Sequence, residues 1–178
     1  MGHFYNLTVG SASGMSDSKL PDMQAGYEKG LTAGISAMTG INLMYESAGM
    51  HASLLGFCLE SLLIDNDMLG SINRNVRGIE VNDETLSFEV ISDVCINGPG
   101  HYLGSDQTLT LMQKEYIYPQ VANRMSPKEW IEAGKPDIVM KAAARKREIL
   151  STYYPEYIPK AIDEAIRCRE DWHRLQEF

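Results

Sequence analysis

Histidine side chains have the most chemistry within reach in this sequence, because an imidazole can donate, accept or carry a proton near neutral pH. His51 follows the apolar run Ile41–Tyr45, and His101 lies in the segment Gly98-Pro99-Gly100-His101-Tyr102. If 41–45 is a strand of a parallel barrel sheet, His51 lies in the loop after that strand, where function concentrates. The alternative for each histidine is a hydrogen bond that only fixes its own loop.

Other chemical motifs fail on residue type or spacing. Asp65-Asn66-Asp67 followed by Gly70 resembles the start of a calcium loop, but Val76 stands where the twelfth position needs glutamate. The sequence has no phosphate-binding loop, no GxGxxG and no HExxH. The sequence contains the residue types of a serine–histidine–aspartate triad, but no GxSxG segment supports one. The sequence therefore indicates no metal site and names no catalytic side chain.

Size and charge narrow the class of protein. The chain has 178 residues, of which 44% are hydrophobic, so it can bury the core of one domain. A net charge of -8 argues against a nucleic-acid surface. The uncharged run Leu31–Tyr45 is too short and too rich in glycine and threonine to span a bilayer. Three isolated cysteines (Cys58, Cys95 and Cys168) and no secretory signal at the start predict a cytoplasmic location.

Residues 1–78 have the order of βα units. The predicted elements are a strand at Phe4–Val9, a loop at Gly10–Asp17, a helix from Pro21 to about Met38, a strand at Ile41–Tyr45, and a helix over about Leu54–Asn73 that Ser53 caps. An alternation of strand and helix favours a parallel sheet. Two such units cannot close a barrel, which needs eight strands and about 250 residues.

Residues 79–178 are predicted to be mainly helical. The expected helices are Glu84–Cys95 after a cap at Asn82 or Asp83, a segment capped by Ser105, one opened by the capping box Ser126-Pro127-Lys128-Glu129, one opened by Pro136, and one from Pro159 to about Gln176.

Several segments acquire meaning from their order and spacing. They are Ser16–Glu28, Asn42–Tyr45 with Ala48–Met50, Arg77–Ile79, Gly98–Leu103, and Arg124 with Trp130. In this order they resemble the C-terminal part of the trimethylamine methyltransferase family, whose complete members are TIM barrels. The resemblance implies an α/β fold: the C-terminal portion of a TIM (β/α)8 barrel followed by several C-terminal helices, as one domain over residues 1–178.

The resemblance also bears on the substrate. Founding members of the family carry pyrrolysine just before an Asp-x-Gln-Ala segment; here Asp22-Met23-Gln24-Ala25 is present, and alignment puts the pyrrolysine position at Leu20. The sequence is therefore similar to the non-pyrrolysine branch, whose members demethylate quaternary amines such as glycine betaine. It implies an enzyme of methylamine metabolism, of the kind found in methanogenesis, that moves a methyl group to the Co(I) of a corrinoid protein.

The chemistry of a quaternary amine agrees with the loss of the special residue. A trimethylated nitrogen is already cationic, and it leaves as a neutral tertiary amine, so its departure needs no general acid. The protein can then act by positioning the methyl carbon in line with cobalt and by excluding water. A tertiary amine must instead be protonated or otherwise activated.

The resemblance implies a set of substrate-binding residues around the second strand. Backbone amides of Met50 and its neighbours at a helix start, with the side chain of His51, are expected to bind the carboxylate of a betaine. Tyr45 and Phe57 are the preferred aromatic faces for the trimethylammonium group. Glu46 either balances the ammonium charge or fixes its loop, and Leu20 sets the pocket volume.

Partners follow from the same resemblance. Cobalamin is expected on a cognate corrinoid protein, so no cofactor is bound directly, and His101 and Tyr102 are predicted to face that protein. Open strand edges of a partial barrel predict a homo-oligomer. The alternative is a truncated, non-catalytic family member that serves in oligomerisation or partner binding.

Overall fold

The computed structural model describes residues 1–168 of the chain. It divides into two compact units, Met1–Lys146 and Arg147–Phe178, and each is described by itself. In the second unit, α8 covers Lys160–Arg167 after Pro159, which confirms the predicted start of the last helix. The predicted end of that helix, near Gln176, lies outside the described residues. Within residues 1–168, no helix combines the length and the apolar character needed to cross a membrane.

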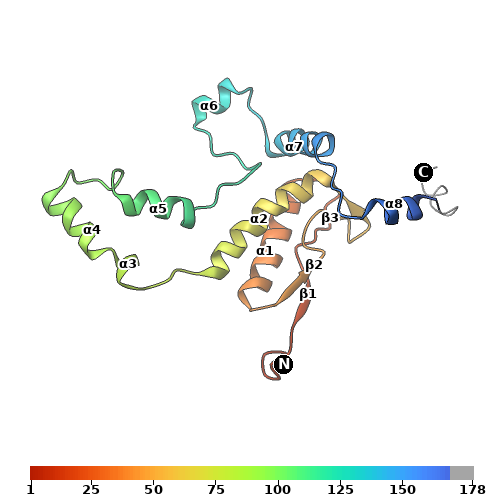
Figure 1. Ribbon diagram of the computed structural model, residues 1–178, viewed down its shortest axis with the longest axis horizontal. Coiled ribbons are helices and arrows are strands. Elements are labelled where there is room, and N and C mark those ends of the chain that lie inside the picture. The colour runs from red at the N-terminus through yellow and green to blue at the C-terminus, as the bar shows by residue number, and fades with distance from the viewer. Residues whose placement is uncertain (169–178) are drawn as a thin grey trace. The chain divides into compact units, whose positions relative to one another are not determined.

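The centre of the first unit is a strand–helix–strand–helix arrangement (Figure 1). Strand β1 (Gly10–Ala12) pairs in parallel with β2 (Leu43–Tyr45), and helix α1 (Met23–Met38) connects them. Helix α2 (Leu59–Arg77) packs beside α1. The predicted parallel pairing and connecting helix are confirmed. The complete TIM barrel stays a prediction, because two parallel strands do not distinguish a barrel from an open sheet.

The predicted strand at Phe4–Val9 is wrong, and β1 lies just after it. Backbone amides of Tyr5 and Leu7 donate to the carbonyl of Gly2 instead, which closes a turn. The rings of Phe4 and Tyr5 meet edge to face at 4.9 Å on the surface of this turn. Their β-forming preference was overridden by local hydrogen bonds.

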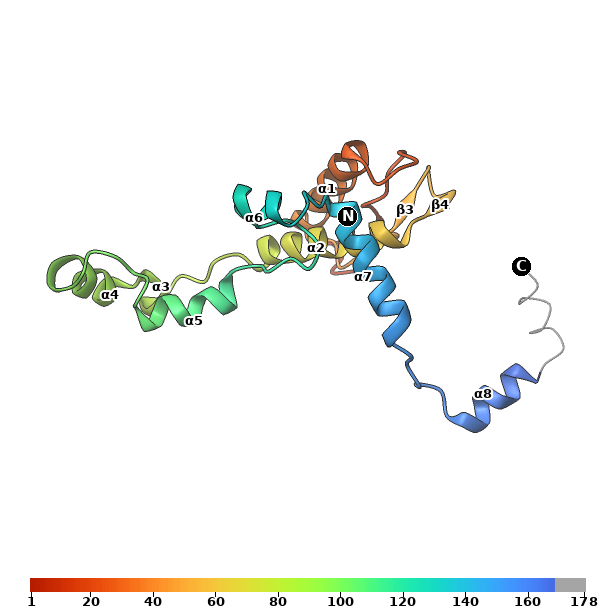
Figure 2. The same cartoon turned by 90° about the horizontal axis from the view of Figure 1, so that it is seen from above.

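The predicted helix start at Ser53 is also wrong. Residues 50–57 form a hairpin, in which β3 (Met50–His51) pairs antiparallel with β4 (Gly56–Phe57) (Figure 2). The residues of its turn, Ala52, Ser53 and Leu54, all have positive φ angles between 51° and 71°, which no right-handed helix allows. The hydroxyl of Ser53 donates to the carboxylate of Asp17 and does not cap a helix. Helix α2 begins only at Leu59.

Helix α1 meets α2 through small side chains. Asp22 caps α1, because its carboxylate accepts from the amide of Ala25 at 3.0 Å. The helix therefore begins at Met23, two residues after the predicted start at Pro21. Ala33 and Ala37 of α1 then pack on Ile72 of α2 to form the core of the unit, which Met44, Met68 and Leu69 extend. The small residues let the two helices approach closely, which fixes the loops at their ends.

The rest of the described chain is mainly helical, as predicted. Its elements are α3 (Asp83–Leu86), α4 (Phe88–Ser92), the π-helix η1 (Asp93–Asn97), α5 (Asp106–Glu115), α6 (Pro127–Glu132) and α7 (Ile138–Thr152). The capping boxes at Asn82 and Ser126 are present. The single helix expected over Glu84–Cys95 is broken at Ser87, whose φ of 55° interrupts the hydrogen-bond ladder.

Candidate functional site

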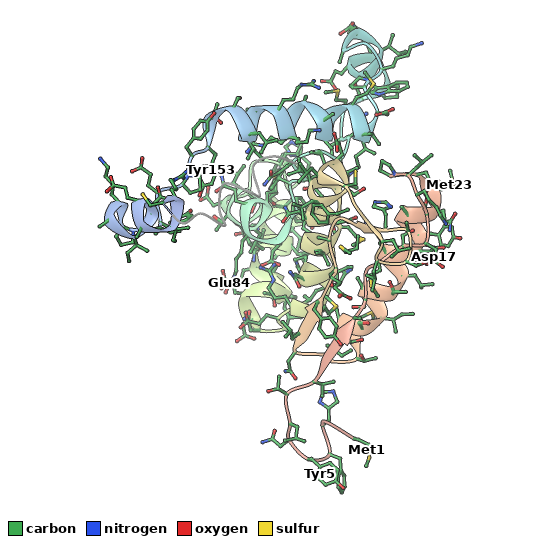
Figure 3. The ribbon with its side chains drawn as sticks, turned by 90° about the vertical axis from the view of Figure 1, so that its right-hand side faces the viewer. Met1, Tyr5, Asp17, Met23, Glu84 and Tyr153 are labelled. Atoms are coloured by element: carbon green, nitrogen blue, oxygen red, sulfur yellow. The ribbon has the colours of Figure 1, made fainter. Side chains whose placement is uncertain are left out.

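Two loops leave the carboxyl edge of the β1–β2 pair and are joined to each other. We call residues 13–22 and 46–58 the loop pair. The amide of Ala52 donates to the carbonyl of Ser18 at 3.0 Å, and Ser53 Oγ donates to Asp17 Oδ1 at 2.6 Å. Asp17 is labelled in Figure 3. The loops at this edge carry ligands in parallel α/β sheets, so the loop pair is the candidate functional site.

His51 is the best-anchored residue of the loop pair. Its side chain is buried, and Nδ1 lies 3.1 Å from the carbonyl oxygen of Ser18. A carbonyl only accepts, so Nδ1 carries the proton and Nε2 is left as an acceptor. Nε2 lies 2.6 Å from Ser61 Oγ and 3.4 Å from Lys29 Nζ. Both ring nitrogens are therefore used within the chain, which supports the loop-fixing alternative; direct binding of a carboxylate by His51 stays a prediction.

A buried ion pair lies next to His51. Lys29 Nζ of α1 is 2.7 Å from Asp65 Oδ2 of α2, and the two residues are only 1% and 4% exposed. The same carboxylate oxygen accepts from the amide of Gly49 at 2.8 Å. We call Lys29, His51, Ser61 and Asp65 the buried polar cluster. It ties both helices to the loop after β2.

Sequence reasoning missed three of the four members of this cluster. Lys29 stands in a row with Ala25, Ala33 and Ala37 at a spacing of four, and all four are buried. A single cation in an otherwise small apolar row was the available signal, because such a charge needs a buried partner. In the sequence Asp65 stands out only as the first residue of an incomplete calcium loop, whereas in the structure its carboxylate pairs with Lys29.

The first loop of the pair is fixed by Glu28 of α1. Its carboxylate accepts from Ser16 Oγ at 2.7 Å, from the amide of Asp17 at 2.9 Å and from Gln24 Nε2 at 2.9 Å. The hydrogen bond from Ser16, followed by that from Gln24, lowers the pKa of Glu28 below its ordinary value. The loop is thus held in place by an ionised carboxylate on the helix that follows it.

The two loops touch where they leave the strands. Gly14 has a φ of 82°, and a Cβ there would lie 2.9 Å from the carbonyl oxygen of Ser47. The hydroxyls of Ser13 and Ser47 are buried at this contact edge, and neither has a hydrogen-bond partner among the described residues. Buried hydroxyls normally have a hydrogen-bond partner, so we expect each of these two to bond to water or to a group from outside the described residues.

The predicted substrate-binding residues lie on the loop pair or at its strand ends. Met50 and Phe57 are register partners in the hairpin, and Phe57 lies against Gly49. Tyr45 is half-exposed and lies over Gly10 of β1. Within residues 1–168, no ring contact joins Tyr45 to Phe57. The structure therefore places both aromatic residues at the carboxyl edge of the strand pair, and their rings do not form a cage.

The other two predicted residues of the set are exposed or strained. Leu20 is 64% exposed in the first loop. Glu46 directly follows β2 and has a φ of 66°, which is unusual for a residue with a side chain. Such a conformation turns the chain sharply away from the strand, so the backbone at Glu46 fixes the direction of the second loop.

His101 and Tyr102 lie in a different region, after η1. Both are exposed, and the hydroxyl of Tyr102 lies 3.2 Å from Cys95 Sγ, an interaction that raises the pKa of Tyr102. Within residues 1–168, no hydrogen bond or ion pair joins them to the loop pair. Their predicted role in facing a corrinoid protein stays a prediction.

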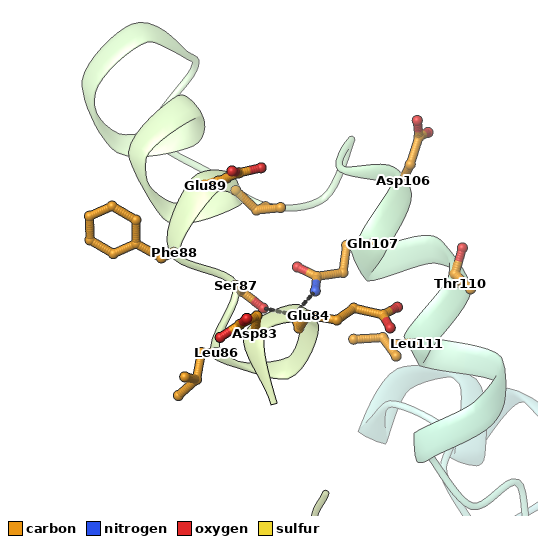
Figure 4. A pocket seen from close by; sticks show the side chains of 11 residues that line it. Asp83, Glu84, Leu86, Ser87, Phe88, Glu89, Asp106, Gln107, Thr110 and Leu111 are labelled. Atoms are coloured by element: carbon orange, nitrogen blue, oxygen red, sulfur yellow. Dashed lines mark hydrogen bonds between the residues drawn. The ribbon is translucent and has the colours of Figure 1, made fainter. Parts of the chain in front are cut away.

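A separate hollow of about 690 Å³ lies between α3, α4 and α5 (Figure 4). Its polar lining includes Gln107, whose Nε2 donates to the carbonyl of Glu84 at 2.6 Å. Its carboxylates, Asp83, Glu84, Glu89 and Asp106, do not form a group able to hold a metal ion, and no other such group occurs in the described part of the chain. The hollow contains none of the predicted site residues.

Comparison with known proteins decides the family. The model of the trimethylamine methyltransferase (MTTB) family matches residues 1–174. The chain belongs to this family. It is 35% identical over 167 residues to a trimethylamine methyltransferase MttB of Desulfitobacterium hafniense, with 94% of this chain and 33% of that protein covered.

Other members of the family are similarly related. The chain is 28% identical over 169 residues to a glycine betaine methyltransferase of Desulfitobacterium hafniense, with 94% of this chain and 34% of the relative covered. It is 33% identical over 153 residues to the trimethylamine methyltransferase MttB of Methanosarcina thermophila, with 86% and 31% covered. The chain thus spans about a third of the length of the family members it matches.

The buried polar cluster yields a test of stability. We expect Lys29→Met to lower the free energy of unfolding by about 3–5 kcal/mol, because it leaves Asp65 buried without its cation. The double variant Lys29→Met/Asp65→Asn should recover most of this loss, since asparagine still accepts from Gly49 and no charge remains. Urea unfolding measures both.

The exposed pair Lys128–Glu132, with 3.9 Å between its charged atoms, provides the matched control. Lys128→Met should change the free energy of unfolding by less than about 1 kcal/mol. If Lys29→Met costs no more than Lys128→Met, the buried pair does not hold the site together.

Proposed function

We propose that this chain forms the C-terminal part of a methyltransferase that moves a methyl group from a quaternary amine, such as glycine betaine, to the Co(I) of a separate corrinoid protein. Family membership supports the methyl transfer. Identities of 35% and 28% to relatives named for the two substrates do not separate them. The choice rests on Leu20, the ordinary residue that the sequence resemblance puts where the founding members of the family carry pyrrolysine.

The electron balance of the reaction explains why an ordinary residue suffices. When the carbon–nitrogen bond of a quaternary amine breaks, its electron pair stays on nitrogen and neutralises the positive charge. No proton is transferred in that step, so no acid is required on the protein. The chain's task is to hold the amine, aim one methyl group at the acceptor and exclude water.

The residues of the loop pair fit this task as binding groups. The rings of Tyr45 and Phe57 remain about half-exposed, so a trimethylammonium group can reach their faces. Leu20 is 64% exposed, so its apolar side chain can contact the substrate where a reactive side chain would otherwise stand. Met50 and Glu46 would line the same edge, and His51 would act by fixing the hairpin that carries Met50 and Phe57.

The acceptor of the methyl group would be a cofactor carried by a partner protein. Cobalamin on a corrinoid protein would supply the nucleophile, and His101 and Tyr102 are the residues we assign to the docking face. Methyl transfer then requires the loop pair and that face to be presented to the same partner.

A second candidate function is favoured by the strand edges. Among the described residues, β1 and β2 pair only with each other, so each has one free edge. Free edges favour pairing with another chain. A non-catalytic role in oligomerisation or partner binding would make use of those edges and would leave the loop pair without a substrate.

The proposed activity is tested on the full-length protein of which we propose this chain to be the C-terminal part. Supplied with reduced cobalamin, it should methylate cobalt from glycine betaine or another quaternary amine in a panel, and much more slowly from trimethylamine. The absorbance change of cobalamin measures the transfer. Turnover of trimethylamine alone, or of none of the panel, contradicts the proposal.

The aromatic faces are tested by substitution in the same protein. Tyr45→Leu and Phe57→Leu should each weaken binding of the cationic amine by about 0.5–2 kcal/mol, which is the range of a cation–π contact. Binding of an uncharged tert-butyl analogue should weaken less, and calorimetry measures both. Phe88→Leu, at an exposed ring on α4, is the control and should change neither. Equal losses for the two ligands would mean that the rings only pack.

A further inference from the structure

The segment 16–22 is an irregular loop that is held in place by side chains. Between β1 and α1, the described backbone bends without forming a helix or a strand. Asp17 and Met23, labelled in Figure 3, mark the beginning of this loop and the start of α1. Ser16 and Ser18 are only 3% and 5% exposed, whereas Leu20 is 64% exposed. Serine is mostly exposed in proteins, so two buried serines in one short loop are the informative feature.

A relay of hydrogen bonds runs from Glu28 of α1 into this loop. The carboxylate of Glu28 accepts from Ser16 Oγ at 2.7 Å, and Ser16 Oγ in turn accepts from the amide of Ser18 at 2.9 Å. The hydrogen bond from Ser16, followed by that from Gln24, holds the pKa of Glu28 below its ordinary value, so the carboxylate is ionised at neutral pH. An ionised acceptor makes the stronger kind of hydrogen bond. We call Glu28, Ser16 and Ser18 the loop relay.

The loop relay ends on the backbone of Leu20. Ser18 Oγ accepts from the amide of Leu20 at 3.2 Å, and it lies 3.1 Å from the carbonyl oxygen of Leu20 and 2.9 Å from Asp22 Oδ1. A hydroxyl has one proton, so Ser18 donates to only one of these two oxygens at a time. The amide of Asp22 donates to the carbonyl of Leu20 at 2.9 Å in either case. Both backbone groups of Leu20 are therefore bonded within the loop, which fixes the point from which its side chain extends.

The cap of α1 does not by itself account for the loop relay. Asp22 caps the helix by accepting from the amide of Ala25, and this bond involves neither Glu28 nor Ser16. Glu28 instead reaches back from the second turn of α1 to the start of the loop, where it also accepts from the amide of Asp17 at 2.9 Å. The relay therefore does something besides starting the helix: it fixes the residues that precede Leu20.

We propose that Glu28, Ser16 and Ser18 are positioning residues that hold Leu20 at a fixed point of the substrate pocket and thereby limit the size of the quaternary amine that is accepted. This inference rests on the proposed function, in which Leu20 contacts the substrate. The three residues act through the backbone of Leu20 rather than by touching the amine. A side chain on a fixed loop excludes an amine with a longer substituent, whereas the same side chain on a mobile loop moves aside for it.

The test measures selectivity in the full-length protein. The ratio of kcat/KM for glycine betaine to that for a betaine with a longer carbon chain is determined with reduced cobalamin as the acceptor. Leu20→Ala should shift the ratio about three- to tenfold towards the longer betaine, because a pocket discriminates between chain lengths by contacts of this kind. Glu28→Ala should shift it in the same direction. Glu28→Gln retains an acceptor oxygen and should leave the ratio close to that of the unchanged protein.

A double-mutant cycle shows whether Glu28 acts through Leu20. In the Leu20→Ala protein, Glu28→Ala should cause no further shift of the ratio, because the side chain that the loop relay positions is already gone. Ser16→Ala removes a single hydroxyl and replaces Glu28→Ala in the cycle if that variant does not fold. Glu89→Ala, at an exposed glutamate of α4, is the control and should leave the ratio unchanged. A shift that is equal with and without Leu20, or one as large for Glu28→Gln as for Glu28→Ala, overturns the proposal.

Hydrogen exchange of the full-length protein, followed by mass spectrometry, tests the loop relay without any substrate. Glu28→Ala should speed up exchange within residues 16–22 by about tenfold or more, because amides there lose their acceptors, and exchange within α2 should not change. Glu28→Gln should have a smaller effect. If the unchanged protein takes methyl groups from no quaternary amine, the proposed function fails, and the exchange result alone then decides whether Glu28 holds the loop. Unchanged exchange in Glu28→Ala overturns the proposal whatever the activity.

Discussion

Lys29 and Asp65 lie away from water on two neighbouring helices, and neither charge is tolerable there without the other. Their ion pair fixes the spacing of α1 and α2, and the shared carboxylate oxygen also holds the amide of Gly49. His51 extends this contact to the carbonyl of Ser18 in the first loop. The buried pair of charges therefore helps to hold both loops at the carboxyl edge, through Gly49 and through His51.

This dependence changes how the proposed site is understood. A site for a quaternary amine needs neutral walls and a fixed aim, and a buried network beneath the loops supplies rigidity without placing a proton donor at the reacting atoms. In the proposed site Leu20, Tyr45 and Phe57 form the exposed lining, and the charges of Lys29 and Asp65 are buried below it. The division agrees with a reaction in which the leaving nitrogen needs no acid.

The sequence predicted the elements that rest on short, local rules. The second strand and the helix before it follow from hydrophobic patterning and breakers, and the capping box at Ser126 follows from one four-residue motif. The first strand is predicted at Phe4–Val9 but forms at Gly10–Ala12. Features that depend on contacts between residues far apart in the sequence were not predicted. The hairpin at 50–57 arises because the loop at Ser16–Ser18 binds its turn, and nothing local to Ser53 reveals that. Lys29 and Asp65 are 36 positions apart, so their pairing needed the packed helices to become visible.

The central claim is that an already cationic nitrogen gives up its methyl group without a proton donor. The most direct test is the pH dependence of a single methyl transfer from glycine betaine to reduced cobalamin, with its solvent deuterium isotope effect. Our account predicts a rate that is flat across the range where the protein stays folded, and an isotope effect near one. A rate that follows the titration of one group, together with a clear isotope effect, would show that a proton moves in the step and would contradict the account.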